Sequence, residues 1–203
     1  EIPVPQLVGC DRKVKTRIVT LGDSVTQGCQ TSEFEYQFWA AQLLDQLGTE
    51  DYSLWNLGIG YARASDCARQ GNWLNRAVAG ADLITVAFGT NDIISGPYGG
   101  TGHATPEEIE ADVRKITRTC TDAGIHTILW NSPPFDMTPE LDGIRTAYNE
   151  TVEGIAKDNG ATYFDVASLL ADPSDASKTV YGQHPNDEGG TVIADALVKL
   201  IQE

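Results

Sequence analysis

Short apolar, β-branched segments alternate with longer segments of helical periodicity along most of the sequence. Residues 82–88 (DLITVAF) form a near-continuous apolar run, which is typical of a strand that is covered on both faces. Similar apolar segments predict further strands at 16–21, 52–57, 126–130 and 162–165. Helical patterns separate these strands, so we expect a parallel sheet whose strands are joined by right-handed crossovers.

Helices are predicted at 35–47, 64–77, 141–159 and 187–201, and another begins after Thr105. Thr105, Pro106 and Glu108 supply that helix with an N-cap, a first-turn proline and a glutamate that can bond back to the cap. The 64–77 helix is weaker because Gly71 interrupts it. The expected fold is therefore an α/β, three-layer flavodoxin-like sandwich with a five-stranded parallel sheet flanked by helices.

Length and charge narrow the classes of protein that need to be considered. We expect the 203 residues to form a single domain, with residues 1–15 as an N-terminal extension. The 29 acidic and 14 basic residues give a formal charge of −15, which argues against nucleic acid and anionic membrane as partners. No apolar run approaches the ~18 residues of a membrane span. Oligomeric state stays open.

The start of the chain and its cysteines suggest little further chemistry. The chain starts with Glu1 rather than Met, and together with its acidity this slightly favours a secreted or extracytoplasmic location, although no signal peptide is visible. The cysteines have no metal-binding spacing, so neither a metal nor a cofactor is expected. Cys120 falls on an apolar helix face and is predicted to be a buried thiol. The sequence leaves undecided whether two of the three cysteines Cys10, Cys29 and Cys67 form a disulfide.

Polar residues follow three of the predicted strands at their carboxyl ends. Ser24 follows the first strand, residues 56–61 follow the second and Asn91 follows the third. Ligands of parallel α/β sheets bind at this edge, so the three segments are expected to converge there. His184 precedes the last helix and can join them if its loop folds over the same edge.

Together these residues supply what acyl transfer needs: a nucleophile, a base and donors for an oxyanion. Ser24 alone is more commonly a turn or cap residue, and Asn91 alone could close its strand in an Asx-turn. His184 is the best-placed histidine, since His103 lies in a glycine-rich loop and His126 starts a strand. Neutral imidazole can take a serine proton near pH 7. The combination favours a serine hydrolase.

The motifs around these residues resemble those of the SGNH (GDSL) hydrolase family. The nucleophile segment is 22–28 (GDSVTQG), the asparagine segment is 89–92 (GTND), and the histidine segment is His184-Pro185. The G-x-S-x-G motif of α/β-hydrolases is absent. The resemblance implies Ser24 as nucleophile, His184 as base, and the Ser24 backbone N–H and Asn91 side chain as oxyanion donors.

The sequence departs from that family at the second motif. The family has a glycine donor five residues after the asparagine, but here Tyr61 stands five residues after Asn56. Gly60 precedes it and eases close approach of the backbone to reacting atoms. Gly60 is therefore the favoured backbone donor, with Tyr61 as the alternative.

A second departure concerns the residue that orients the histidine. The family places an aspartate three residues before it, and this sequence has Tyr181 there. Either Ser24 and His184 work as a dyad with a backbone carbonyl holding the ring, or Asp187 or Asp165 substitutes for the missing acid.

The expected activity is hydrolysis of short acyl esters, in first place acetyl esters, on a small molecule or a carbohydrate. The 94–104 segment is polar and no long apolar lid is visible. Some large aromatic residues could stack on a sugar, although burial in the core is the commoner role. These are Trp39, Trp73, Trp130 and Tyr98. The alternatives are a lysophospholipase or thioesterase of the same family, and a weakly catalytic carbohydrate-binding module.

Overall fold

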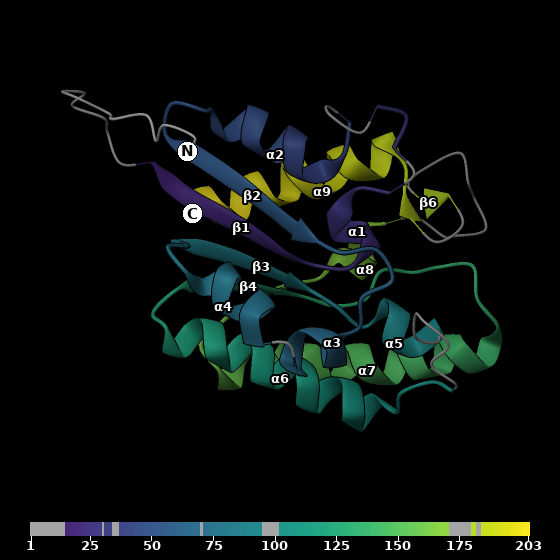
Figure 1. Ribbon diagram of the computed structural model, residues 1–203. Coiled ribbons are helices and arrows are strands. Elements are labelled where there is room, and N and C mark those ends of the chain that lie inside the picture. The colour runs from purple at the N-terminus through teal and green to yellow at the C-terminus, as the bar shows by residue number, and fades with distance from the viewer. Residues whose placement is uncertain are drawn as a thin grey trace, which may run out of the picture.

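A single parallel sheet forms the centre of the molecule (Figure 1). The computed structural model of the protein describes residues 15–29, 31–33, 37–69, 71–94, 102–170, 180–181 and 184–203. Five strands pair in the order β2-β1-β3-β4-β5, and every pair is parallel. They are β1 (Thr16–Gly22), β2 (Tyr52–Gly58), β3 (Leu83–Ala87), β4 (His126–Trp130) and β5 (Thr162–Phe164). The five predicted strands are confirmed.

Helices cover both faces of this sheet, as Figure 1 shows. One face packs against α2 (Trp39–Leu47), α8 (Val166–Leu169) and α9 (Asp187–Gln202). The other face packs against α3 (Ala64–Arg69), α4 (Gly71–Val78), α6 (Pro106–Asp122) and α7 (Pro139–Asp158). Each face has its own apolar cluster of buried side chains. The predicted three-layer α/β sandwich is therefore confirmed.

The central strand β3 shows why its sequence is almost continuously apolar. All five of its residues are buried, and only Thr85 among them is polar. Ile84 and Val86 belong to the cluster under α6 and α7, whereas Leu83 and Ala87 belong to the cluster under α2 and α9. Successive side chains of a strand point to opposite faces, so a strand covered on both faces favours apolar residues at nearly every position.

Helix α6 begins as its sequence predicts. The Thr105 side chain accepts a hydrogen bond from the Glu108 backbone N–H, and the Glu108 side chain accepts one from the Thr105 backbone N–H. Pro106 opens the helix, where its missing N–H costs no intrahelical bond. Gly124 follows with a φ of 77°, in the left-handed region where glycine ends helices.

Two predicted helices differ from the prediction. The helix expected over 64–77 is divided into α3 and α4, and α4 begins at Gly71, the residue that weakens the helical pattern. Helix α2 begins at Trp39 rather than near residue 35. Phe38 is its N-cap and offers no side-chain hydrogen bond, so nothing in the local sequence marked this start.

Several very short elements were not predicted at all. Helix α1 (Ser24–Gln27) follows β1, helix α5 (Thr90–Ile94) begins two residues after Phe88, and the strands β6 (Val180–Tyr181) and β7 (His184–Pro185) form an antiparallel pair. Elements of two to five residues are too short to show periodicity. These unpredicted elements carry the candidate catalytic residues.

The described cysteines are free thiols. Cys120 is fully buried, as predicted, and Cys67 is buried as well. Cys29 and Cys67 are not joined to one another, and Cys10 lies outside the described residues. Across the described part of the chain, no helix has both the length and the apolar character needed to cross a membrane.

Candidate active site

The site lies where the strand order of the sheet reverses. Strand β1 is flanked by β2 and β3, and Gly22 at its end has Gly58 and Ala87 as its cross-strand Cα partners. The three chain segments that follow these strands therefore leave the sheet side by side. Such a reversal point at the carboxyl ends of parallel strands opens a crevice for ligands.

Ser24 is the first residue of helix α1. Its neighbour Asp23 is buried and caps the helix, because Asp23 Oδ1 accepts a hydrogen bond of 2.9 Å from the Val25 backbone N–H. The Trp39 indole N–H donates to the Val25 carbonyl at 2.9 Å, which ties α1 to α2. A first-turn N–H has no partner within its own helix. No described residue accepts a hydrogen bond from the Ser24 N–H.

His184 reaches Ser24 across 160 positions of sequence. Its Nε2 lies 2.8 Å from Ser24 Oγ. Two features fix the histidine backbone: its strand β7 pairs with β6, and Asn186 caps α9 by accepting a 2.9 Å hydrogen bond from the Gly189 N–H. Tyr181 is the cross-strand Cα partner of His184. The Tyr181 side chain lies outside what the structure describes.

The second ring nitrogen of His184 is buried and has no hydrogen-bond partner among the described residues. Both carboxylates proposed as substitutes for the missing acid are engaged elsewhere. Asp187 accepts hydrogen bonds from the backbone N–H and the hydroxyl of Ser32. Asp165 accepts one of 2.6 Å from the Asn131 side chain. Neither Asp187 nor Asp165 therefore replaces the aspartate that the resemblance implies.

Asn91 stands on the other side of β1 from the β2 loop, in helix α5, and its side chain is buried. Its Nδ2 donates to the Ala62 carbonyl at 3.1 Å. A primary amide has two N–H groups, so one remains for a ligand. The Ala62 backbone N–H in turn donates to the Ile59 carbonyl at 3.1 Å. Asn91 is thus tied to the turn 59–62 that follows β2.

Tyr61 has an unusual backbone conformation in this turn. Its φ is 64°, and it is the only non-glycine residue with positive φ in the described part of the chain. A turn with positive φ at its third position normally has glycine or asparagine there. For other residues this conformation costs about 1–2 kcal/mol. No described residue accepts a hydrogen bond from the Gly60 N–H or the Tyr61 N–H.

Asn56 and Gly58 hold this loop against the nucleophile helix. Asn56 Nδ2 donates to the Thr26 carbonyl at 2.9 Å, and Asn56 Oδ1 accepts hydrogen bonds from the Thr20 hydroxyl and the Gly58 N–H. A Cβ on Gly58 would lie 2.3 Å from the Gln27 backbone nitrogen. Asn56 of the second motif therefore holds β2 and α1 together, a role that was not predicted from the sequence.

Two buried carboxyl groups lie beside the site. Burial, with a smaller contribution from the charge of Asp92, raises the pKa of Asp23 to about 7. Burial raises the pKa of Asp92 to about 6 against the opposing effects of the hydrogen bond from the Ala64 N–H and of the Arg63 charge. Burial lowers the pKa of His184, which favours the neutral imidazole that a base must be.

The aromatic residues considered for sugar stacking are mostly core residues. Trp39 and Trp130 are buried, with ring centroids 4.8 Å apart, so stacking on a ligand by these two is ruled out. Trp73 is partly buried against the core, and its indole N–H donates to the Leu57 carbonyl at 3.2 Å. Tyr98 lies outside the described residues.

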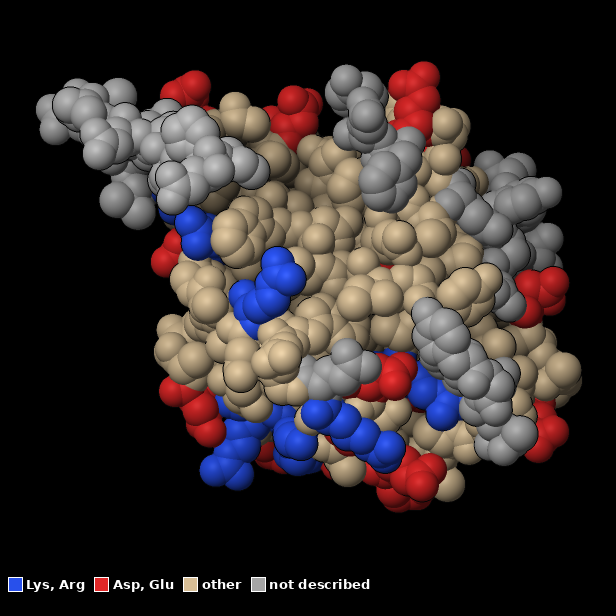
Figure 2. Space-filling view, viewed as in Figure 1, with Lys and Arg blue, Asp and Glu red and all other residues tan. Residues whose placement is uncertain are grey.

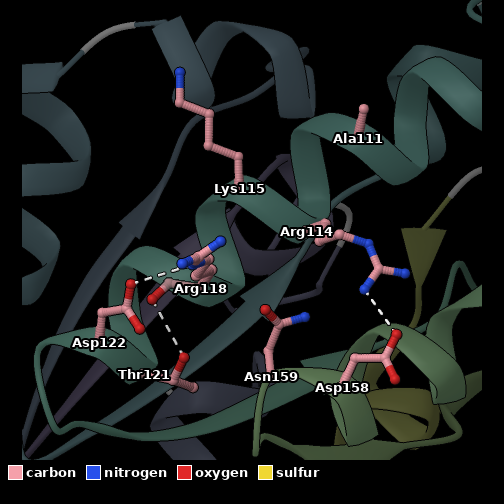
Figure 3. A pocket seen from close by; sticks show the side chains of 8 residues that line it. All are labelled: Ala111, Arg114, Lys115, Arg118, Thr121, Asp122, Asp158 and Asn159. Carbon is pink, nitrogen blue, oxygen red and sulfur yellow. Dashed lines mark hydrogen bonds and ion pairs between the residues drawn. The ribbon is translucent and has the colours of Figure 1, made fainter.

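A separate hollow of about 660 Å³ lies between α6 and α7 (Figure 3). The carboxyl end of α6 leads to the start of β4, so this hollow lies towards the edge of the sheet opposite Ser24. Its arginines are paired with acids: Arg114 with Asp158 at 2.9 Å and Arg118 with Asp122 at 3.3 Å. No group of three or more metal-ligating side chains occurs among the described residues.

Comparisons with known proteins identify the family and the fold. Residues 20–192 match the model of the GDSL-like lipase/acylhydrolase family. No curated protein sequence matches the chain. An acetylxylan esterase from Geobacillus stearothermophilus is similar in structure, with a TM-score of 0.75 and 17% identity, covering 93% of this chain and 96% of the other.

Two further solved structures share the fold. A carbohydrate acetylesterase family member from Sinorhizobium meliloti has a TM-score of 0.74 and 18% identity, covering 93% of this chain and 98% of its own. The aryl esterase of M. smegmatis has a TM-score of 0.71 and 18% identity, covering 93% and 99%. At these identities the likeness establishes the fold.

Proposed function

The chain belongs to the GDSL-like lipase/acylhydrolase family and is a carboxylic ester hydrolase, and we propose that it removes short acyl groups, in first place acetyl, from carbohydrate esters. The observation that carries the mechanism is the 2.8 Å contact between Ser24 Oγ and His184 Nε2 at the carboxyl edge of the sheet. This is the distance at which a base takes a proton from a nucleophile.

The proposed reaction has two halves. As Ser24 Oγ attacks the ester carbonyl carbon, His184 Nε2 takes its proton and a tetrahedral oxyanion forms. The imidazolium then gives that proton to the alcohol oxygen, the bond between carbon and alcohol breaks, and an acyl-serine remains. In the second half, water attacks the acyl carbon while His184 takes its proton. The bond to Ser24 Oγ then breaks, His184 returns the proton to Oγ, and the carboxylic acid is released.

Three donors are proposed for the oxyanion: the Ser24 N–H, the second Nδ2 hydrogen of Asn91, and one N–H of the turn 59–62. For the last we now favour Tyr61 over Gly60. Tyr61 stands at the offset where the resemblance places a glycine donor, and its backbone adopts the left-handed conformation that glycine adopts readily. The tie from Asn91 to the Ala62 carbonyl supports a fixed spacing between the two donors.

The pair is proposed to act as a dyad. No described carboxylate contacts the second ring nitrogen of His184, and Asp187 and Asp165 are engaged with other residues. The hairpin of β6 and β7 and the capped start of α9 fix the backbone on both sides of the histidine. Backbone placement thus does part of the work that an orienting aspartate does in a triad.

Two observations support a neutral carbohydrate substrate. The solved structures of similar fold include an acetylxylan esterase and a carbohydrate acetylesterase family member. In addition, the area over the end of β2 and α1 in Figure 2 is largely uncharged. A charged ligand would lose hydration on such a surface without meeting an opposite charge, so an uncharged surface favours an uncharged ligand.

The proposed function predicts that Ser24→Ala abolishes ester hydrolysis. Without the hydroxyl no acyl-serine can form, so kcat for p-nitrophenyl acetate should fall by at least about a thousandfold. The measurement is the initial rate of p-nitrophenol release under saturating substrate. A fluorophosphonate probe should label the unaltered protein at Ser24, as read by peptide mass spectrometry.

Ser53→Ala is the matched control, because Ser53 is the second residue of β2 and lies near the end of the strand opposite the carboxyl edge. It should keep the rate of the unaltered protein. Circular dichroism should show that both variants are folded. A Ser24→Ala variant that is folded and retains its rate would refute the mechanism, and carbohydrate binding without labelling would favour a binding module.

A further inference from the structure

The turn 59–62 presents apolar side chains to solvent beside the nucleophile. Tyr61 is 72% exposed and Ile59 is 47% exposed. Such exposure is unusual here, since only two other large hydrophobic side chains in the described part of the chain are exposed, Trp55 and Leu169. Tyr61 is the most exposed of the four, so its ring adds little to the folded core.

Hydrogen bonds to the backbone hold the turn 59–62 in place, although the side chains of Ile59 and Tyr61 are exposed to solvent. The Ile59 N–H donates to the Gly22 carbonyl at 3.0 Å, which ties the turn to the end of β1. The Ala62 carbonyl accepts from Asn91 Nδ2 at 3.1 Å, which ties it to α5. The exposed side chains of Ile59 and Tyr61 thus sit on a rigid support between the strand that leads to Ser24 and the proposed oxyanion donor.

Tyr61 also occupies a backbone conformation that favours glycine. Its φ is 64°, and the exposed ring gains little burial to offset the strain. Strain that packing does not offset is found at sites where a side chain contacts a ligand. An exposed tyrosine on a rigid loop offers a flat apolar face and a hydroxyl, which suits a ligand with one apolar and one polar side.

We infer that Tyr61, with Ile59 beside it, is a specificity-determining residue whose ring packs against the alcohol part of the ester, a sugar ring. This inference rests on the proposed function. If the acyl group is acetyl, only a methyl group lies on the acyl side of the carbonyl carbon. A methyl group is too small to cover a ring with this exposure, so the group that covers Tyr61 belongs to the alcohol.

Two acetate esters with different alcohols test this inference. Ethyl acetate has a small alcohol, and peracetylated methyl β-xyloside has a sugar ring; acetate release from both can be followed by pH-stat titration. Tyr61→Asn removes the ring but keeps a residue that tolerates the left-handed region. The ratio of kcat/KM on the xyloside to kcat/KM on ethyl acetate should fall about tenfold, mainly through KM.

The ratio is the readout because it cancels any effect of the substitution on the backbone donor. Tyr61→Phe should keep the ratio within about twofold, since the ring face remains. Trp55→Asn is the matched control: it removes another exposed aromatic ring, which lies in β2 under the guanidinium of Arg17, and should leave the ratio unchanged.

An unchanged ratio in Tyr61→Asn would overturn the inference and leave the proposed function standing. A fall of both kcat/KM values by the same factor would overturn it too, because Tyr61 would then act only through the turn. Absence of Ser24-dependent acetate release from either ester by the unaltered protein would instead overturn the proposed function, and the inference with it.

Discussion

Burial favours the neutral form of three ionisable side chains near Ser24. It lowers the pKa of His184 and raises the pKa values of Asp23 and Asp92. A neutral histidine is ready to accept the serine proton, and a carboxyl group that is partly protonated near neutral pH repels an oxyanion less. Burial therefore keeps His184 in the neutral form that a base needs, and it reduces the negative charge on the neighbouring carboxyl groups of Asp23 and Asp92.

The acid limb of the pH–rate profile should reflect the protonation of the His184 imidazole. Because burial lowers the pKa of His184 below its ordinary 6.5, the imidazole stays neutral to more acidic pH. We expect the acid limb of kcat/KM on p-nitrophenyl acetate to have its midpoint below pH 6.5. The measurement is a profile of kcat/KM over a series of buffers of equal ionic strength.

Asp23→Asn and Asp92→Asn are the controls for this assignment, because burial raises the pKa values of both carboxyl groups towards neutrality. The limb that persists in both variants belongs to the histidine. A midpoint above 6.5 would contradict the expectation and would indicate a carboxylate partner for the second ring nitrogen, since a nearby negative charge raises a histidine pKa.

Close contact between two elements places the nucleophile. Helix α1 lies directly on the end of β2, where Gly58 leaves room for the backbone of Gln27. Asn56, which lies in β2, fastens the same two elements by donating a hydrogen bond to the Thr26 carbonyl of α1. The position of Ser24 relative to the turn 59–62 therefore depends on how tightly α1 can approach β2.

Gly58→Ala should damage activity and stability together. The new Cβ would lie 2.3 Å from the Gln27 nitrogen, so α1 must move away from β2. We expect kcat/KM to fall at least about tenfold, because small displacements of reacting groups are costly. The free energy of unfolding should fall by about 1–3 kcal/mol through overpacking. Enzyme assays and urea denaturation measure the two effects.

Gly154→Ala is the matched substitution in a position with room. Gly154 lies in α7, and a Cβ there meets nothing within 4 Å. Alanine should stabilise the helix by about 0.5–1 kcal/mol and leave kcat/KM unchanged. If Gly58→Ala behaved like Gly154→Ala, the close packing of α1 on β2 would not be what places Ser24.

The prediction of elements succeeded where periodicity was long and failed where it was short. Helix α6 carries an apolar stripe and a complete capping box, and it was predicted with its start. Helix α1 has only four residues, and its one sequence signal was the capping Asp23 before Ser24. Strands β6 and β7 have two residues each and exist because they pair with one another.

At the scale of the whole molecule, the acidic residues behind the formal charge of −15 lower stability in two ways, through repulsion at the surface and through the ionisation of buried Asp23. Changing the salt concentration distinguishes the two effects. Acidic residues on the surface repel one another, and ions screen that repulsion. Asp23 is buried, so salt affects the cost of ionising it much less. Its raised pKa means that the folded state binds more protons than the unfolded state between about pH 4 and pH 7.

The Asp23 contribution therefore destabilises the fold as pH rises through this window. Asparagine also caps helices, so Asp23→Asn should keep α1 and remove the titration. We expect the difference in unfolding free energy, variant minus unaltered protein, to increase by about 2–3 kcal/mol between pH 5 and pH 8. Urea denaturation of both proteins at the two pH values gives this difference, in which the titration of His184 cancels.

Repeating the denaturation at high salt provides the control for surface charge. The difference between the two proteins should persist, whereas the stability of each should rise at pH 8 as surface repulsion is screened. A difference that is flat with pH would show that Asp23 titrates in the folded protein as it does in the unfolded chain.

The sequence by itself determined the sheet, its helical layers and the edge at which polar residues gather. These follow from local patterns, because apolar runs and helical stripes dictate which surfaces must be buried, and parallel strands must all end at one edge. The motifs at Ser24, Asn91 and His184 also sufficed for the family. None of this depends on exact distances.

Only the tertiary structure decided how these parts meet. It placed His184 Nε2 at 2.8 Å from Ser24 Oγ, left the other ring nitrogen without a described partner, and buried Trp39 and Trp130 in the core. It also gave Tyr61 a conformation typical of glycine. Each of these outcomes is set by contacts between segments far apart in the chain, and a local pattern of residues carries no information about such contacts.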